Sequence, residues 1–260
     1  MSYETIILER KDGVGTLTLN RPEKLNALNR KMTEELNSAI VEVAKDKGVR
    51  VLVVTGAGRG FCSGADIGDM AQAATPVENR YWTQMAHKII LGLTDLEKPV
   101  IAKVNGVAVG IGCSLALSAD IIVASENAKF SLIFSRIGLI PDGGSLFHLP
   151  RLVGPAKAKE LIFTAKMVDA KEAERIGLIN RAVPADELDK EVDMLARQLA
   201  EGPTAAFGMA KKIMNKGLNT DLSSVLEYEA FGQAIAGTTQ DAQEGIMAFL
   251  EKRKAEFKGK

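Results

Sequence analysis

The sequence has few cysteines and histidines and no excess of either charge. Of its 260 residues, two are cysteine and two are histidine, and its 33 basic residues equal its 33 acidic residues. Cys62 and Cys113 lie far apart in the chain and form no metal-ligand spacing with His87 and His148. We therefore expect no metal site, and both thiols are interpreted as structural.

The chain also lacks a strongly basic region and an uninterrupted apolar run of membrane-spanning length. Its longest basic block is the C-terminal tail EKRKAEFKGK, so the charge pattern argues against DNA or RNA and favours a small-molecule partner. The N-terminal MSYETIILERKDG carries charges inside its apolar run, unlike a signal or transit peptide, and we expect a cytoplasmic protein. The apolar stretch Val104–Ala124 contains Asn105, Asp120 and three glycines, which favours a turn, a helix and a buried strand over a membrane span.

Apolar strands and amphipathic helices alternate along the first part of the chain. Asn29 is a good helix N-cap, and apolar residues recur after it at helical spacing to about Lys45. The alternation predicts an α/β core with parallel strands, opened by a hairpin at Lys11–Gly13. The expected strands are Thr5–Glu9, Val14–Leu19, Val51–Thr55, Val100–Val104, Ile121–Ala124, Lys129–Ile133 and Leu178–Val183. The expected helices of this part lie within Pro76–Leu93, near Cys113–Leu117, at Ser145–Leu152 and Pro155–Thr164, and from Asp169 onward.

Beyond Pro184 the pattern changes to helices only. We expect an α/β body over residues 1–195 and a helical C-terminal part over residues 196–260. The predicted helices are Asp186–Ala200, Pro203–Asn215, Asp221–Ile235, and a last one from Thr239 or Gln240 to about Phe257.

Two glycine-rich segments each follow a predicted buried strand. In GAGRGFCSGAD, Gly56–Asp66, the glycines let the backbone approach a ligand and present N–H groups to it. In VNGVAVGIGCSLALSAD, Val104–Asp120, three glycines precede a short helix whose first N–H groups have no partner within the helix. Each segment can supply one N–H to a developing oxyanion, and the alternatives are a flexible loop and a tight packing site.

Six segments follow one another over essentially the whole chain: NRPEKLNALN (Asn20–Asn29), GRGFCSGADI (Gly58–Ile67), KPVIAKVNGVAVGIGCSLALSADI (Lys98–Ile121), IGLIPDGGS (Ile137–Ser145), AKEAERIGLI (Ala170–Ile179) and FLEKRKAEF (Phe249–Phe257). Taken together and in this order, they resemble the crotonase, or enoyl-CoA hydratase/isomerase, superfamily. The resemblance implies the ClpP/crotonase fold, a spiral of ββα units with a helical C-terminal trimerisation part. It also implies an acyl-CoA substrate, a homotrimer or dimer of trimers, and no cofactor besides the coenzyme A that is part of the substrate.

The resemblance also assigns roles to individual residues. Ser63 and Ile111, the latter preceded by Gly110, would donate their backbone N–H groups to the thioester oxygen. Phe249 and Lys252 would meet the nucleotide end of a ligand, in the same or a neighbouring subunit, although Lys252 also fits a solvated helix face. The adenine and pantetheine path would be lined by Lys24, Leu25, Ala27, Ala65, Asp66 and Ile67.

Hydratases of this family use two glutamates to activate water, and this chain has neither. Ser114 and Phe134 occupy those positions, and neither side chain takes a proton from water near neutral pH. The chain offers Asp142 instead, held in a turn by Pro141 on one side and by two glycines on the other. A single carboxylate can move a proton between two carbons once the enolate oxygen is stabilised.

We therefore expect an enoyl-CoA isomerase that converts 3-enoyl-CoA to 2-enoyl-CoA with Asp142 as the acid/base. Phe134 would line a drier pocket and raise the pKa of Asp142. The alternatives are an enoyl-CoA hydratase, a ring-opening isomerase of the epoxyphenylacetyl-CoA type, or another thioester-enolate reaction. Asp142 can also be a plain N-cap for the helix that follows. RNA binding is a remote alternative, because glutamates intersperse the basic residues Arg30, Lys31, Lys45 and Lys47.

Overall fold

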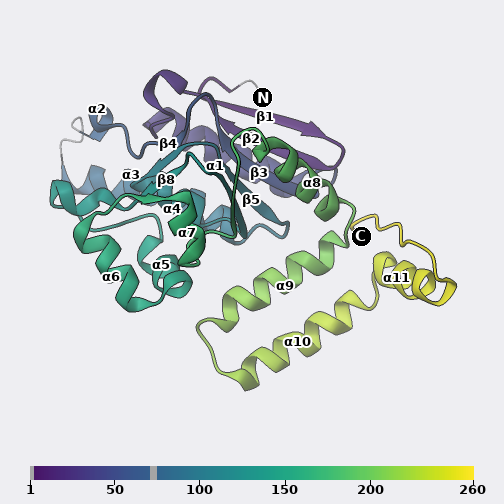
Figure 1. Ribbon diagram of the computed structural model, residues 1–260. Helices are drawn as coiled ribbons and strands as arrows, with labels where there is room; N and C mark the ends of the chain where they lie inside the picture. Colours follow the sequence, from purple (N-terminus) through teal and green to yellow (C-terminus); the bar gives the residue numbers. More distant parts are fainter. Residues whose placement is uncertain (1–2, 71–74) are drawn as a thin grey trace.

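Two β-sheets form the body of the part of the chain that the structure describes (Figure 1). The computed structural model describes residues 3–70 and 75–260. The larger sheet has the order β1 (Ile6–Lys11), β2 (Val14–Leu19), β3 (Val51–Gly56), β5 (Val100–Val104), β7 (Ile121–Ser125), β10 (Arg181–Val183). The smaller sheet has the order β4 (Gly60–Cys62), β6 (Val107–Val109), β8 (Lys129–Ser131), β9 (Val168–Asp169).

From β3 to β8, successive strands alternate between the two sheets. Strands β3, β5 and β7 lie side by side and parallel in the larger sheet, while β4, β6 and β8 do so in the smaller one. Helix α3 (Pro76–Thr94) returns the chain from β4 to β5, and α4 (Ile111–Leu117) returns it from β6 to β7. The predicted spiral of strand-strand-helix units is therefore confirmed.

Local sequence signals account for the first elements. Asp12 and Gly13 both have positive φ, 52° and 80°, which is the two-residue turn that matches the twist of a hairpin between β1 and β2. Helix α1 (Arg30–Lys45) begins after Asn29, whose side chain accepts a hydrogen bond of 2.8 Å from the Met32 N–H. Both predictions are confirmed.

The larger sheet is buried on both faces. Along β3, Leu52 and Val54 belong to the main core, while Val51 and Val53 pack against α8 (Leu188–Ala200). The predicted division at residue 195 falls inside α8, which continues to pack on the sheet beyond that residue. The remaining elements of the body are η1 (Pro22–Lys24), α2 (Ile67–Met70), η2 (Ile133–Ile137), α5 (Ser145–Val153), α6 (Pro155–Thr164) and α7 (Ala170–Arg175).

Helices α9 (Thr204–Gly217), α10 (Leu222–Ala236) and α11 (Gln240–Glu251) follow α8. Figure 1 shows α9 and α10 side by side and away from the sheets, with α11 beyond them. Lys211 fastens α9 to the body, because its Nζ donates to the Leu93 carbonyl at 2.8 Å and forms a 2.8 Å ion pair with Asp120. None of the described helices is long and apolar enough to cross a membrane.

The last helix is shorter than predicted. It ends at Glu251 rather than near Phe257, because Lys252 adopts a left-handed conformation with φ 55°. The tail then folds back, and the Asp241 carboxylate accepts hydrogen bonds from the N–H groups of Lys258 and Gly259 at 2.6 and 2.7 Å. These hydrogen bonds hold the tail against the start of α11, and they compete with an extension of the helix beyond Glu251.

Three short strands, β4, β6 and β9, were not predicted, and β10 starts later than the predicted strand. Strands β4 and β6 span three residues each within the glycine-rich segments, and β9 spans two. A run of two or three residues is too short to show the alternation of apolar and polar residues that predicts a strand. These strands form because they pair with neighbouring strands in the folded chain.

Candidate active site

The two glycine-rich segments meet at the ends of β4 and β6. A Cβ atom on Gly64 would lie 3.1 Å from the carbonyl oxygen of Val109, and one on Gly110 would lie 3.8 Å from Cα of Gly64. Both glycines have positive φ, 110° and 56°, which other residues rarely adopt. Glycine at these two positions, 46 residues apart in sequence, therefore brings the two segments into backbone contact.

The turn that carries Asp142 packs against the first turn of α4. A Cβ atom on Gly143 would lie 2.8 Å from Cβ of Ser114 and 3.3 Å from Cδ1 of Ile111. The Ser114 hydroxyl donates to the main-chain carbonyl of Asp142 at 2.9 Å, and the Ser145 hydroxyl donates to the same oxygen at 2.8 Å. The main chain of Asp142 is thus fixed beside Ile111, as the predicted site requires.

The Asp142 side chain does not cap α5. Helix α5 begins after Gly144 without a side-chain cap, and Asp142 Oδ1 is buried with no hydrogen-bond partner among the described residues. The alternative interpretation of this acid as an N-cap is therefore wrong. Burial raises the pKa of the Asp142 carboxyl above its ordinary value, and the nearby imidazole of His87 partly opposes that rise. An unpaired, desolvated carboxyl of this kind is a candidate acid/base.

The prediction of Ser63 as an oxyanion donor is not supported by the backbone hydrogen bonds. The Ser63 N–H donates to the Leu25 carbonyl at 3.0 Å, so it is already occupied. Ala65 instead forms a parallel bridge with Leu28, in which Leu28 N–H donates to Gly64 at 2.8 Å and Asp66 N–H donates to Leu28 at 2.9 Å. In such a bridge the N–H of the central residue faces away from the partner strand.

The Ala65 N–H consequently has no hydrogen-bond partner among the described residues. The same holds for Ile111, the first residue of α4, because the preceding Gly110 provides no side-chain cap. Both N–H groups flank the contact between Gly64 and Gly110. The arrangement offers two unpaired donors from two adjoining segments, which is what an oxyanion requires.

Two asparagine amides hold the first segment in shape. Asn26 is fully buried, and its Nδ2 donates to the carbonyls of Ala57 and Gly60 at 2.9 and 2.8 Å. Asn105 Nδ2 donates to Gly56 and Gly58 at 2.9 and 2.8 Å. Sequence reasoning missed both residues, although Asn26 stands inside the NRPEKLNALN motif.

An ion pair holds the end of the same segment. Arg21 donates to Asp66 at 2.9 Å and to the Ala27 carbonyl at 2.7 Å, and both charged side chains are largely buried. The hydrogen bond from Arg21 lowers the pKa of the Asp66 carboxyl, although burial opposes it. The ion pair thus holds Asp66 in place next to Ala65, and Arg21 is a further residue that the sequence analysis missed.

The residues at the two hydratase glutamate positions line the site without supplying acid/base groups. A Cβ atom on Gly110 would lie 4.0 Å from Cζ of Phe134, so this ring lies next to the backbone donors. The Ser114 hydroxyl is committed to the Asp142 carbonyl.

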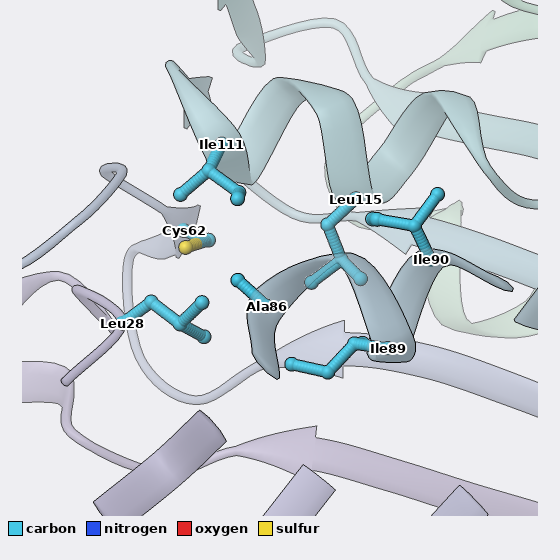
Figure 2. Close-up of a pocket in the computed structure, with 7 residues that line it drawn as sticks. All are labelled: Leu28, Cys62, Ala86, Ile89, Ile90, Ile111 and Leu115. Carbon is cyan, nitrogen blue, oxygen red and sulfur yellow. The ribbon is translucent and has the colours of Figure 1, made fainter. Parts of the chain in front are cut away.

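A small apolar cavity of about 10 Å³ lies beside Ile111, between α3 and α4 (Figure 2). Burial raises the pKa of the Cys62 thiol in its wall to about 11, so this sulfur is protonated near neutral pH, as expected of a structural thiol. The described residues contain no group of three or more His, Cys, Asp or Glu placed to hold a metal ion. The cavity is lined by Leu28, Cys62, Ala86, Ile89, Ile90, Ile111 and Leu115.

The remaining predicted binding residues fall into two groups. Lys24 and Ile67 are exposed close to the Ser63–Asp66 segment, Leu25 contacts that segment and Ala27 is buried beneath it. Phe249 lies in the last turn of α11 and Lys252 directly follows the helix, and Figure 1 places α11 on the side of the molecule opposite α2. Both residues therefore lie away from α2, which contains the predicted binding residue Ile67 of the same chain.

Comparisons with known proteins show which proteins the chain is similar to. The family model described as enoyl-CoA hydratase/isomerase matches residues 9–260. Crotonyl-CoA hydratase of Syntrophomonas wolfei is 41% identical over 258 residues, 99% of each chain. The 1,2-epoxyphenylacetyl-CoA isomerase of Escherichia coli is 40% identical over 260 residues, again 99% of each. A crystal structure of enoyl-CoA hydratase from Bacillus anthracis matches with a TM-score of 0.95 at 32% identity, covering 99% of this chain and 100% of that one.

Proposed function

The chain belongs to the enoyl-CoA hydratase/isomerase family, and from that premise we propose that it is an enoyl-CoA isomerase converting 3-enoyl-CoA to 2-enoyl-CoA. The observation that carries this proposal is the half-buried Asp142 carboxyl, whose Oδ1 is buried without a hydrogen-bond partner among the described residues, in a turn that packs against Ile111. Neither hydratase glutamate is present, since Ser114 and Phe134 stand in their places. One acid/base and two oxyanion donors suffice for a double-bond shift.

In the proposed reaction the thioester oxygen accepts hydrogen bonds from Ala65 and Ile111. Asp142 removes a proton from C2, and the electron pair of that C–H bond delocalises over the thioester as a dienolate. Asp142 then returns the proton to C4, which leaves the double bond between C2 and C3. Atoms and electrons balance without an oxidant or reductant, so the coenzyme A of the substrate is the only cofactor we propose.

We also propose that the working protein is a homotrimer or a dimer of trimers. The support is the surface of α10, which buries none of its residues within one chain and exposes large apolar side chains. Contact between copies would cover that surface and would bring Phe249 and Lys252 towards a neighbouring site. The exposed residues are Leu222, Leu226, Phe231 and Ile235 of α10.

The test is to supply matched 3-enoyl-CoA and 2-enoyl-CoA to the purified protein and to identify the products by mass spectrometry. We expect 3-enoyl-CoA to become 2-enoyl-CoA, and Asp142→Asn to lower that rate by about 10² or more, the loss typical for a general acid/base. Asp193→Asn, an exposed acid on α8, is the matched control and should retain the rate.

Enoyl-CoA hydratase is the second candidate, favoured by the names of several relatives, among them the Syntrophomonas and Clostridium acetobutylicum enzymes. Rapid hydration of 2-enoyl-CoA by both wild type and Asp142→Asn would favour it over the isomerase. The Escherichia coli relative supports a third possibility within isomerase chemistry, a ring-opening isomerase, which a 1,2-epoxyphenylacetyl-CoA assay would test.

A further inference from the structure

Asp69 is a carboxylate close to the site that the proposed reaction does not use. It lies in α2, which directly follows Ala65 and Asp66, and its Oδ2 accepts a hydrogen bond of 2.9 Å from the Arg30 N–H. Arg30 is the first residue of α1, and the first N–H groups of a helix have no partner within the helix. The carboxylate therefore joins α2 to the start of α1, where the positive end of the helix dipole also favours it.

The two helices that this hydrogen bond joins are held to the body in different ways. Helix α1 is fixed by its Asn29 cap and by core residues such as Met32 and Leu36, which are 0% and 1% exposed. Helix α2 spans only four residues, and its Ile67 is 73% exposed, so this apolar side chain does not anchor α2 in the core. Asp69 thus attaches α2 to a firmly packed helix.

The hydrogen bond from Arg30 continues a set of contacts that starts at Ala65. Ala65 forms the parallel bridge with Leu28, and Asp69 accepts from the N–H of Arg30, two residues further along the chain than Leu28. The segment from Ala65 to Asp69 is thus fastened to the start of α1 at both of its ends. Ala65 is itself exposed, so its N–H is accessible to a ligand and its position depends on these contacts rather than on burial.

We propose that Asp69 is a positioning residue, which holds the Ala65 N–H in the place relative to the Ile111 N–H that a thioester oxygen requires. This role rests on the acyl-CoA function proposed above and adds a determinant of its oxyanion site. An oxyanion donor acts mainly in the transition state. A misplaced Ala65 N–H should therefore lower kcat more than it raises KM.

The test removes this hydrogen bond from either side. Asp69→Leu takes away the acceptor, while Asp69→Asn keeps an oxygen without the charge. Arg30→Pro takes away the donor, because proline has no N–H yet suits the first position of a helix. Asn29 already has the extended conformation that precedes proline, with φ −102° and ψ 176°. Arg30→Ala keeps the N–H and is the reference for Arg30→Pro, and Glu34→Leu controls for the loss of an exposed acid on α1.

Two readouts separate positioning from a merely structural role. The first is kcat and KM for 3-enoyl-CoA. The second is the infrared C=O stretch of bound hexanoyl-CoA, isotope-labelled at the carbonyl carbon, because hydrogen bonds to the carbonyl oxygen shift this stretch to lower frequency. A loss of stability alone leaves the carbonyl frequency in the folded protein unchanged. Hexanoyl-CoA has no double bond to shift, so the second readout does not depend on turnover.

We expect Asp69→Leu to lower kcat about tenfold and to reduce the carbonyl shift, with KM changed less than about threefold. Arg30→Pro should show the same losses relative to Arg30→Ala. Asp69→Asn should keep most of the rate, and Glu34→Leu should match wild type. Because both changes remove one hydrogen bond, Asp69→Leu combined with Arg30→Pro should lose about tenfold relative to Arg30→Ala, whereas independent effects would multiply to about a hundredfold.

Unchanged kcat and carbonyl frequency in Asp69→Leu, or losses that multiply in the double variant, overturn the role of Asp69 while leaving the acyl-CoA function intact. If Asp69→Leu does not fold, the comparison of Arg30→Pro with Arg30→Ala decides in the same way. A wild type that binds hexanoyl-CoA without converting 3-enoyl-CoA contradicts the isomerase function, and the carbonyl shift then decides the role of Asp69. If the wild type binds no thioester, the acyl-CoA function fails, and the role of Asp69 fails with it.

Discussion

The glycine-rich loops at the site and the C-terminal helices differ in how their residues pack. In the loops, glycine backbones touch one another so closely that a Cβ on Gly112 would lie 2.2 Å from the Cys62 carbonyl. In the C-terminal helices, large apolar side chains such as Phe231 and Phe249 are 62% and 83% exposed. The site loops thus pack backbone against backbone within one chain, while α10 and α11 leave apolar surface uncovered. Added volume should therefore damage the first region, and added charge should damage the second.

The largest effect is expected from adding one methyl group between the loops, as in Gly112→Ala. The new Cβ would overlap the Cys62 carbonyl, so β4 must move away from α4 and shift the Ala65 N–H relative to Ile111. We expect kcat/KM to fall about 10²-fold, as when an oxyanion donor is misplaced, and the free energy of unfolding to fall by about 1–3 kcal/mol. Steady-state kinetics and urea denaturation measure both.

Gly60→Ala is the matched control for that variant. It lies in the same strand as Cys62, but its Cβ would meet only side chains, at 3.4–3.5 Å. It should leave kcat/KM nearly unchanged, and equal losses in the two variants would contradict the contact argument.

Added charge on the C-terminal surface should act on assembly rather than on folding. Phe231→Glu places a carboxylate in the exposed apolar surface of α10, and we expect association to weaken about 30-fold or more. Light scattering after size-exclusion chromatography would show smaller particles, with an unchanged circular dichroism spectrum. Gln233→Glu adds the same charge at an exposed polar position of that helix and should retain the assembly. A monomeric wild type would contradict the proposed trimer.

A smaller effect is expected from the ion pair that positions the loop. Arg21→Met removes the donors to Asp66 and Ala27, so Ala65 is held less firmly, and we expect kcat/KM to fall about tenfold. The free energy of unfolding should fall by about 1 kcal/mol at pH 7. The exposed Arg59→Met in the same segment is the control.

The pH dependence of that stability difference has a definite sign. Arg21 lowers the pKa of Asp66 in the folded protein, so the pair stabilises the fold above the ordinary aspartate pKa of about 3.9. This contribution is lost as the pH falls through the lower folded pKa. Denaturation curves of wild type and Arg21→Met should therefore converge below about pH 4, and a constant difference would contradict the ion-pair role.

The smallest effect is expected from Asp142→Asn on the free energy of unfolding, and its sign is opposite to that of Arg21→Met. Burial raises the pKa of this carboxyl, so its contribution to stability is present below the unfolded pKa and is lost as the pH rises through the folded pKa. At pH 7 the Asn variant should be as stable as wild type, or more stable by about 1 kcal/mol at most, while activity is lost. Thermal denaturation of wild type and Asp142→Asn at pH 7 and pH 3.5 would measure this difference in stability. A marked destabilisation of the variant at pH 7 would indicate a structural role for the carboxylate.

Most of the body could be read from the sequence because its signals are local. The hairpin at Asp12–Gly13, the Asn29 cap and the strands of the larger sheet follow from turn chemistry and apolar period. The placement of Asp142 beside Ile111 followed from the family resemblance together with the glycines of its turn. Short strands such as β4 and β6 could not be read, because their pairing partners lie far away in the sequence.

By itself the sequence indicated which residues are candidates for the chemistry, since an acid between proline and two glycines and a glycine before a short helix are local patterns. The tertiary structure alone decided which groups are available. Leu25 occupies the Ser63 N–H, while the bridge to Leu28 leaves that of Ala65 free. It also ended α11 at Glu251. The physical reason is that a donor or acceptor is free only when no distant segment has already paired with it, and pairing between distant segments is a property of the folded chain.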